Sequence, residues 1–160
     1  VWRWFKGNID ELKDYDYIFI DLSPSYDLIA RNFMLISDSI ITPLEYQDIA
    51  SIRGCELFYQ KFNQDLEEME MTNEAKRAVV INSYTNRKLS SGDIFSEYLD
   101  TFNNIKQDLL ETKISDTTIV KNAILNKMDI DDYLKKMKKA HKIREEFNNF
   151  IEELLRREVL

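Results

Sequence analysis

The sequence is poor in the residues from which phosphate-binding loops, disulfides and metal sites are built. Its three glycines, Gly7, Gly54 and Gly92, are isolated from one another. A phosphate-cradling loop needs clustered glycines followed by Lys and Ser or Thr, and no such run occurs in the 160 residues. The single cysteine, Cys55, cannot form an internal disulfide, and the single histidine, His141, lacks neighbours at metal-ligand spacing. These absences exclude an internal phosphate loop and argue against a transition-metal site.

Long apolar runs and an excess of basic residues are also missing. No stretch approaches the roughly 18 apolar residues of a membrane span, and no signal peptide is visible. Lys and Arg number 22 against 29 Asp and Glu, so the net charge is −7 and only a local basic face could attract nucleic acid. A cytoplasmic location is the default expectation. The length and the 44% hydrophobic content fit one folded domain spanning residues 1–160.

An apolar run that ends in a carboxylate organises the first part of the chain. Residues 17–20 read Tyr-Ile-Phe-Ile, which is typical of a strand buried on both faces. Asp21 follows directly, and residues 23–25 (Ser-Pro-Ser) then break the strand. Ligands bind at the carboxyl ends of strands in open α/β sheets, so Asp21 could hold Mg²⁺ or its water. The alternative is that Asp21 only caps the next turn.

Strands and helices are expected to alternate along the rest of the chain. Further strands are predicted at 39–42, 78–81 and 111–114, and helices at 27–36, 47–69, 91–102 and 131–157. This β-α-β-α-β-α-β-α order predicts an α/β protein with a parallel sheet and flanking helices. Expected inward positions are Ile49, Ile52, Leu57, Phe58, Phe62 and Leu66 in the 47–69 helix, and Leu134, Met137, His141, Phe147, Phe150, Ile151 and Leu154 in the last helix. Four strands are few for a sheet covered on both faces, and the chain begins at Val1, so we expect an N-terminal portion to be missing.

One basic run stands out in this acidic chain. Between residues 135 and 144 there is no acid, and the cations are Lys135, Lys136, Lys138, Lys139, Lys142 and Arg144. On one helix these charges would cover most of the outer surface and could bind DNA without sequence preference. The alternative is a solvated helix face balanced by the glutamates that follow it.

Several segments, in the same order and at similar spacing, resemble ParA-type partitioning ATPases, which are MinD-like proteins with a deviant P-loop. The run 15–25 resembles the family's "YDYIIIDTPPS" segment: Asp21, Pro24 and Ser25 match, while Leu22 and Ser23 differ. Other similar segments are Asn32-Phe33-Met34, Ser37-Asp38, Ile41-Thr42-Pro43-Leu44, Ala50 with Gly54, Tyr84 with Arg87, Leu89 and Ser90, and residues 114–123. The resemblance covers about residues 14–155.

The resemblance implies a fold and a set of site residues. The fold would be an incomplete P-loop NTPase (SIMIBI-like) fold. Asp21 would act on Mg²⁺ through water near the γ-phosphate. Asn82 would bind adenine, and Ser115, Asp116 and Thr117 would wall the adenine pocket. The family's triphosphate loop lies before the position of Val1, so this chain would be the C-terminal portion and would neither hydrolyse ATP nor bind ATP and Mg²⁺ tightly by itself.

The resemblance also implies a biological role and partners. The intact protein would form an ATP-dependent homodimer and partition plasmids or chromosomes. It would bind nonspecific DNA through the basic run and be stimulated by a ParB-like partner protein, with no membrane involved. The competing hypothesis is a non-catalytic α/β interaction module that does not bind nucleotide.

Overall fold

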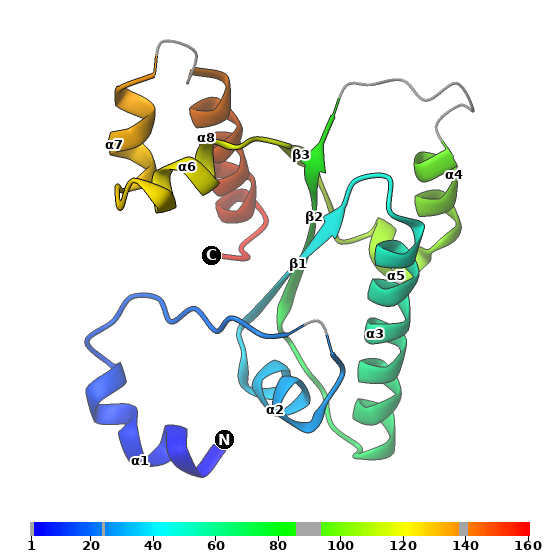
Figure 1. Cartoon of the computed structure of the whole chain (residues 1–160). Coiled ribbons are helices and arrows are strands. Elements are labelled where there is room, and N and C mark those ends of the chain that lie inside the picture. Colours follow the sequence, from blue (N-terminus) through cyan, green and yellow to red (C-terminus); the bar gives the residue numbers. More distant parts are fainter. Residues whose placement is uncertain (1, 24, 86–93, 138–140) are drawn as a thin grey trace.

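Three parallel strands alternate with helices in the computed structural model, which describes residues 2–23, 25–85, 94–137 and 141–160 (Figure 1). The elements, in chain order, are α1 (Trp2–Leu12), α2 (Leu28–Ile36), β1 (Ser39–Glu45), α3 (Ile49–Glu68), β2 (Lys76–Tyr84), α4 (Ile94–Thr101), α5 (Asn103–Lys106), β3 (Leu109–Ser115), α6 (Ile119–Leu125), α7 (Ile130–Lys135) and α8 (His141–Arg156). The α/β fold with a parallel sheet and flanking helices, predicted from the sequence, is therefore confirmed.

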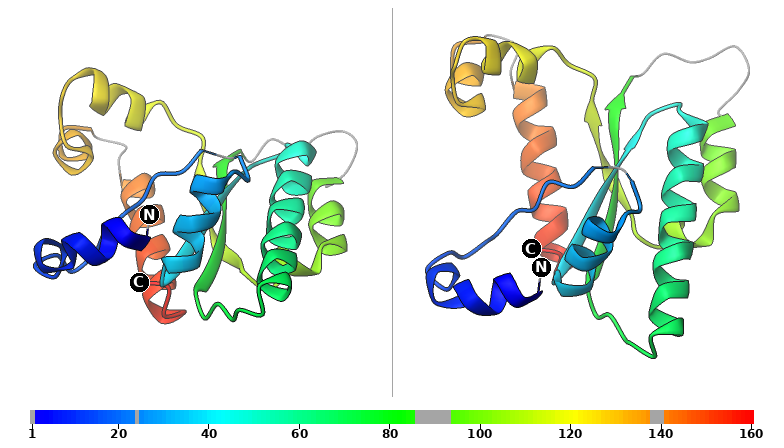
Figure 2. Two further views of the ribbon diagram at one scale, coloured as in Figure 1. Left: turned by 90° about the horizontal axis from the view of Figure 1, so that it is seen from below. Right: turned by 60° about the horizontal axis from the view of Figure 1, so that its bottom comes forward.

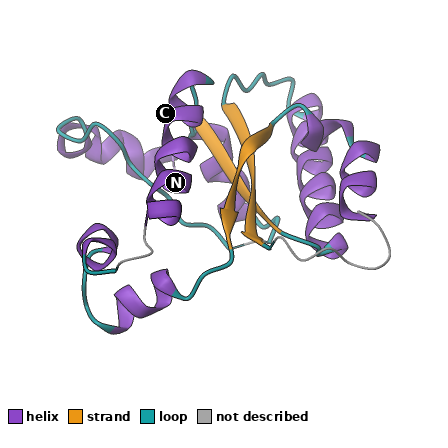
Figure 3. Ribbon diagram, turned by 90° about the horizontal axis from the view of Figure 1, so that it is seen from above, coloured by secondary structure: helices purple, strands orange, loops and turns teal. Residues whose placement is uncertain are grey.

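The sheet has the order β1-β2-β3, and both pairs are parallel. Parallel neighbours require crossover connections; α3 makes the first, and α4 with α5 makes the second. Helices cover both faces of the sheet, as Figure 3 shows from above. The central strand β2 is consequently enclosed, and its four successive residues 78–81 are all buried. This enclosure explains why 78–81 reads as a continuous apolar run.

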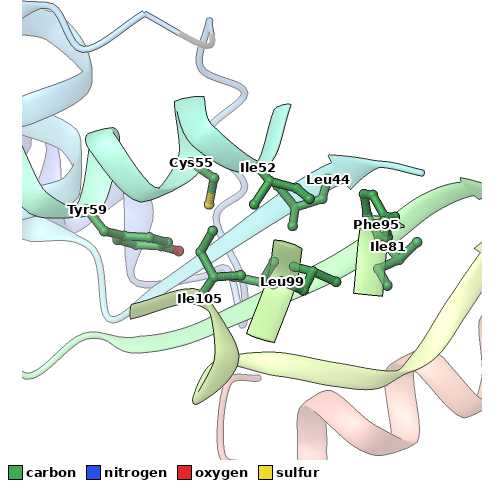
Figure 4. Packing of buried hydrophobic residues seen from close by; sticks show 9 residues of the cluster. Leu44, Ile52, Cys55, Tyr59, Ile81, Phe95, Leu99 and Ile105 are labelled. Atoms are coloured by element: carbon green, nitrogen blue, oxygen red, sulfur yellow. The ribbon is translucent and has the colours of Figure 1, made fainter. Parts of the chain in front are cut away.

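The larger core lies between α3 and the sheet (Figure 4). Ile52, Cys55 and Tyr59 of α3 pack against Leu44 of β1 and Ile81 of β2. The Tyr59 hydroxyl also reaches the hydroxyl of Thr42 on β1 at 2.8 Å, so the one polar atom of this ring is satisfied. Cys55 is thus a packing residue, and burial raises the pKa of its thiol to about 12. A thiol that remains protonated is a poor nucleophile.

The opposite face of the sheet is covered by α8, whose position is visible in both views of Figure 2. Leu154 of α8 and Val159 beyond it form a buried cluster with Ala78 and Val80 of β2 and Leu110 of β3. Residues of β2 therefore alternate between the two cores, with 79 and 81 toward α3 and 78 and 80 toward α8.

Two glutamates of α8 bind the free edge of β3. The Glu153 carboxylate accepts hydrogen bonds from the N–H groups of Glu111 and Thr112, both at 2.9 Å. Two helical turns earlier, Glu146 accepts from the N–H of Ser115 at 3.0 Å and from its hydroxyl at 2.6 Å. The unpaired N–H groups of an edge strand can otherwise form hydrogen bonds with a strand of another protein chain. α8 therefore satisfies and blocks this edge.

The strand predicted at residues 17–20 is wrong. The segment is extended but pairs with no strand among the residues that the structure describes. Tyr17, Ile18 and Phe19 are 56%, 47% and 78% exposed. Apolar residues make a buried strand only when a neighbouring strand and a covering layer are present, and here neither encloses them.

The outer edge of β1 helps to explain why segment 17–20 does not join the sheet. The N–H of Tyr46 donates to the carbonyl of Asn82 on β2 at 2.9 Å, so the N–H of the preceding residue, Glu45, points away from β2. That N–H is already bound by the Ser51 hydroxyl at 3.1 Å. Two residues earlier on the same side, Pro43 has no N–H. The carboxyl half of this edge therefore offers no free N–H to an added strand.

The single C-terminal helix predicted from residue 131 to 157 is also wrong. Two helices, α7 and α8, occupy this stretch, and residues 138–140 between them lie outside the described residues. Met137 is 38% exposed and the His141 side chain 94%, so neither faces inward as predicted. The helices meet instead where Leu134 of α7 packs with Ile143 of α8.

Two further inward predictions fail for a simpler reason. Leu57 on α3 and Ile151 on α8 are exposed. Each is flanked by buried or half-buried residues of the same helix, such as Phe58 and Phe150. The buried face of each helix is therefore narrower than the stripe of apolar residues in its sequence.

Candidate functional site

The carboxyl ends of the three strands lie side by side and bring together the four residues predicted to contact adenine. Glu45 of β1 is in register with Asn82 of β2, and Tyr84 of β2 with Ser115 of β3. The N–H of Asp116 donates to the carbonyl of Tyr84 at 2.9 Å, which holds the loop after β3 against the end of β2. Asn82 and residues 115–117 therefore share one edge of the sheet, called here the carboxyl edge. This edge is where ligands bind in open α/β sheets.

The polar side chains at the carboxyl edge differ in whether they have hydrogen-bond partners. Among the described residues, neither the exposed amide of Asn82 nor the exposed carboxylate of Asp116 has a hydrogen-bond partner. The Ser115 hydroxyl, by contrast, is bound to Glu146, and the Thr117 hydroxyl accepts from the first N–H of α6 at 3.2 Å. Asn82 and Asp116 are therefore available to a ligand, whereas the hydroxyls of Ser115 and Thr117 have structural partners.

Three aromatic residues that the sequence did not predict as site residues lie at the carboxyl edge. The ring centroid of Tyr46, just after β1, lies 4.7 Å from that of Tyr84 and 5.2 Å from that of Phe95 on α4. The ammonium of Lys113 lies 4.8 Å from the centre of the Tyr84 ring. Tyr46 directly follows β1 and Tyr84 is the last residue of β2, and these positions are the signal that could have placed them here. Tyr46 and Tyr84 pack against the core beneath α3, so these rings border the carboxyl edge on that face of the sheet.

The backbone at this edge is strained at two positions. Gln47 has a φ of 66° and Ser83 a φ of 55°, both in the left-handed region that non-glycine residues seldom occupy. They lie next to Tyr46 and Tyr84, so each turn sets the direction of an aromatic side chain. Such strain gathers at functional sites more often than elsewhere.

Asp21 lies apart from this group. Its carboxylate is exposed and makes no hydrogen bond or ion pair among the described residues, and no contact joins it to Asn82 or to residues 115–117. In Figure 1 its segment runs from α1 across to the start of α2. The carboxylate has no partner among these residues, and they alone do not bring it to the carboxyl ends of the strands.

The chain just after Asp21 is anchored. Asp27, which is the N-cap of α2, accepts from the N–H groups of Ile29 and Ala30, both at 2.9 Å. These backbone N–H groups, with the hydroxyl of Ser25, hold the pKa of the Asp27 carboxyl below its usual value. The segment that carries Asp21 is therefore fixed at its end.

A second contact fastens α2 to α3. The Tyr26 hydroxyl donates to the carboxylate of Asp65 on α3, and Arg31 forms an ion pair with the same carboxylate at 2.7 Å. Burial and the nearby Asp65 raise the pKa of Tyr26 well above its ordinary value, so this hydroxyl stays a donor. The position of Asp21 thus depends on α3 through a short chain of contacts.

A metal ion would find one protein ligand at Asp21. The described residues contain no group of three His, Cys, Asp or Glu side chains that could hold a metal ion. A single carboxylate fits Mg²⁺, which keeps several waters and takes its remaining ligands from substrate phosphates. Asp21 is therefore compatible with a water-mediated Mg²⁺ contact in the presence of a nucleotide.

The basic run is divided between α7 and α8. Three of its described cations have carboxylate partners: Lys135 with Asp132 at 2.8 Å, Lys142 with Glu146 at 3.4 Å and Arg144 with Asp131 at 3.9 Å. Lys136 instead lies 3.5 Å from the sulfur of Met128. Exposed pairs of this kind are weak and exchange readily with other anions. The predicted residues Lys138 and Lys139, like Pro24 and the 87–90 segment, lie outside the described residues.

A comparison with models of protein families finds a match in the first half of the chain. A family model for an AAA domain matches residues 3–77. This family consists of P-loop NTPase-like domains and includes ParA- and MinD-like proteins. The match covers less than half of the chain and contains the Asp21 segment, α2, β1 and α3. No curated protein and no solved structure matches the chain.

The architecture of the sheet is consistent with the family match. A three-stranded parallel sheet with flanking helices is consistent with part of a P-loop NTPase-like fold. Among the described helices, none is both long and apolar enough to cross a membrane.

Proposed function

We propose that this chain is the base-binding and switch portion of a ParA-type ATPase that acts in plasmid or chromosome partitioning. The observation that carries the proposal is the carboxyl edge, where Asn82 and residues 115–117 meet beside the Tyr46–Tyr84 pair. The AAA-domain match over residues 3–77 adds support, because it contains the Asp21 segment that resembles the family motif. Neither observation depends on the other.

In this proposal the carboxyl edge binds adenine. A carboxamide can donate to a ring nitrogen of adenine while accepting from its amino group, and Asn82 offers both groups without a competitor among the described residues. The ring of Tyr84 or Tyr46 would supply the flat apolar contact. Ser115 and Thr117 would contribute backbone atoms, since their hydroxyls are engaged within the chain.

Asp21 is proposed to act on the phosphate side. Asp21 would hold Mg²⁺ through a water, and the ion would supply charge neutralisation during phosphoryl transfer to water. The Asp21 carboxylate would accept a hydrogen bond from that water, since it has no partner among the described residues. These 160 residues contain no glycine-rich loop for the triphosphate, so we propose that hydrolysis needs a loop from outside them and that ATP binds this chain weakly.

The affinity of the chain for AMP tests the base site. Replacing Asn82 with alanine is expected to weaken AMP binding about tenfold, the value of one or two lost hydrogen bonds. The dissociation constant can be measured by NMR titration of the isotope-labelled chain. Asn149→Ala, an exposed amide on α8, is the matched control and should leave the affinity unchanged. Equal affinities for the wild type and Asn82→Ala would remove Asn82 from the site.

A second candidate function is a non-catalytic interaction module. The engagement of the Ser115 hydroxyl by Glu146 favours it, because that hydroxyl is not available to a nucleotide. In that case the carboxyl edge would bind a protein rather than a nucleotide. The two functions differ in one readout, because the module would show no saturable response to adenine nucleotides.

DNA binding is proposed to use the basic run, in an intact dimer that a ParB-like protein stimulates. The test is a salt titration of the full-length protein on random duplex DNA, comparing wild type with a variant in which Lys135, Lys136, Lys138 and Lys139 are changed to Glu. Each lysine that neutralises a phosphate adds roughly one to the slope of log affinity against log salt, so the variant should lose both affinity and slope.

The control for this experiment makes the same change of charge at four other exposed lysines, namely Lys13, Lys61, Lys106 and Lys127. It should retain most of the slope. If both variants lose affinity equally, only the net charge matters. If the 135–139 variant behaves as wild type, that run is not the DNA site.

A further inference from the structure

A polar pocket of about 440 Å³ lies at the opposite end of the sheet from the carboxyl edge. Its walls come from the start of β2 (Lys76 and Arg77), from the turn between α5 and β3 (Gln107 and Asp108) and from Arg157 just after α8. In Figure 1 this is the end at which β2 and β3 begin. The pocket is open to solvent, its volume can admit a small anion, and its lining is almost wholly charged or amide.

Arg77 is held in this pocket without a counter-ion. Its guanidinium carbon lies 5.0 Å from the centre of the Tyr59 ring and 5.5 Å from that of Phe62, and its Nη2 donates to the side-chain oxygen of Asn63 at 3.0 Å. All three partners are neutral. No described carboxylate lies within the 4.0 Å of an ion pair. Arg77 is therefore a half-buried, fixed cation with donors to spare.

Asp108 is the corresponding unpaired anion. It is half-buried, and its carboxylate makes no hydrogen bond or ion pair among the described residues. Burial raises the pKa of this carboxyl, while the charges of Arg77 and Arg157 act in the opposite direction. A partly buried charge without a partner is costly. Here an arginine and an aspartate face one cavity and do not touch.

The other cations of the pocket are already partly neutralised. Arg157 is paired with Glu153 at 2.9 Å, and Lys76 with Glu158 at 3.4 Å. The net positive electrostatic potential in the pocket is therefore weak. The specific chemistry therefore depends on Arg77 and Asp108. Arg77 requires a ligand group that accepts hydrogen bonds, and Asp108 requires a group on the same ligand that donates one.

We propose that this pocket binds a phosphate that carries a hydroxyl donor beside its anionic oxygens. The oxygens would accept from Arg77, and the hydroxyl would donate to Asp108. Inorganic phosphate retains a P–OH group at neutral pH, and a phosphate ester of a small polyol carries alcohol hydroxyls. Sulfate has the same shape and a similar charge but no proton to donate, so the Asp108 carboxylate should repel it.

The experiment compares phosphate, sulfate and glycerol phosphate at neutral pH and matched ionic strength, by NMR titration of the isotope-labelled chain. Phosphate or glycerol phosphate should bind saturably and shift the amide signals of residues 76, 77, 107 and 108. Sulfate should bind at least about tenfold more weakly, because one charged hydrogen bond is replaced by a repulsion. Preference for inorganic phosphate would identify a free-phosphate site, and preference for glycerol phosphate an ester site.

Two variants decide whether these residues are responsible. Asp108→Asn should bring sulfate within about threefold of phosphate, because the new amide can donate to either anion. Arg77→Gln should abolish saturable binding of both, whereas Lys106→Gln, at the exposed end of α5, should change neither. Asp108→Asn changes no volume, so it remains decisive if Arg77→Gln does not fold. Equal affinity for phosphate and sulfate in the wild type, unchanged selectivity in Asp108→Asn, or no saturable binding of any of the three probes would overturn the proposal.

Discussion

Replacing Glu153 with alanine is expected to lower the free energy of unfolding by about 2–4 kcal/mol, because two backbone N–H groups lose their acceptor and a half-buried arginine loses its counter-ion. Glu153 is 4% exposed. Its loss would leave the N–H groups of Glu111 and Thr112 on the edge of β3 without acceptors and would leave Arg157 without its carboxylate. Chemical denaturation monitored by circular dichroism measures the change.

The neighbouring residue supplies the control. Glu152 is exposed on the same helix turn, and Glu152→Ala should change the free energy of unfolding by less than about 0.5 kcal/mol. Glu153→Gln should fall between the two, since it keeps one oxygen acceptor but loses the charge. Similar stabilities for Glu153→Ala and Glu152→Ala would show that α8 does not secure the β3 edge.

The contribution of Glu153 also depends on pH. Burial by itself raises the pKa of this carboxyl, but the N–H groups of Glu111 and Thr112 and the charge of Arg157 outweigh burial and lower it. A carboxyl whose pKa is lower in the folded state contributes its full stability above the pKa of the unfolded chain. That contribution is lost as the pH falls through the folded-state pKa. The difference between wild type and Glu153→Ala should therefore be largest at neutral pH and shrink in acid.

Changing Asp21 to asparagine is expected to slow ATP hydrolysis about a hundredfold or more in a protein that joins this sequence to a glycine-rich phosphate loop. The variant keeps the size of the side chain but removes the charge that would hold a Mg²⁺-bound water, and preorganised electrostatic contacts of this kind carry such factors. Steady-state phosphate release measures the rate. Stability should not change, because Asp21 is exposed and has no partner among the described residues.

Asp16→Asn is the matched control for Asp21. Asp16 is an exposed acid in the same segment, five residues earlier, and its replacement should leave the hydrolysis rate unchanged. A rate for Asp21→Asn within about twofold of wild type would contradict the proposed role and would favour the simpler one of a residue in a turn.

Sequence patterns predicted what local burial determines. The 78–81 run is apolar because β2 is enclosed on both faces, so its position followed directly from its composition. The carboxyl-edge grouping of Asn82 with residues 115–117 was predictable for a similar reason, since parallel strands must end on the same side.

Sequence patterns failed where a residue depends on a distant partner. The 17–20 run has the composition of a buried strand, but a strand also needs a neighbour, which its own residues do not encode. Glu146 and Glu153 looked like solvated charges, and only the fold places them on the edge of β3. Arg77 and Asp108, 31 positions apart in the sequence, gave no local sign that they share a pocket.

The most direct test of the nucleotide proposal is a chemical-shift map of the labelled chain titrated with AMP, with GMP as the comparison. Adenine and guanine differ in the groups that a carboxamide reads. We expect AMP to shift the amide signals of residues 82–84 and 115–117 more strongly than GMP does, with little change at residues 76, 77 and 108. No saturable shifts with AMP, or shifts confined to residues away from the carboxyl edge, would contradict it.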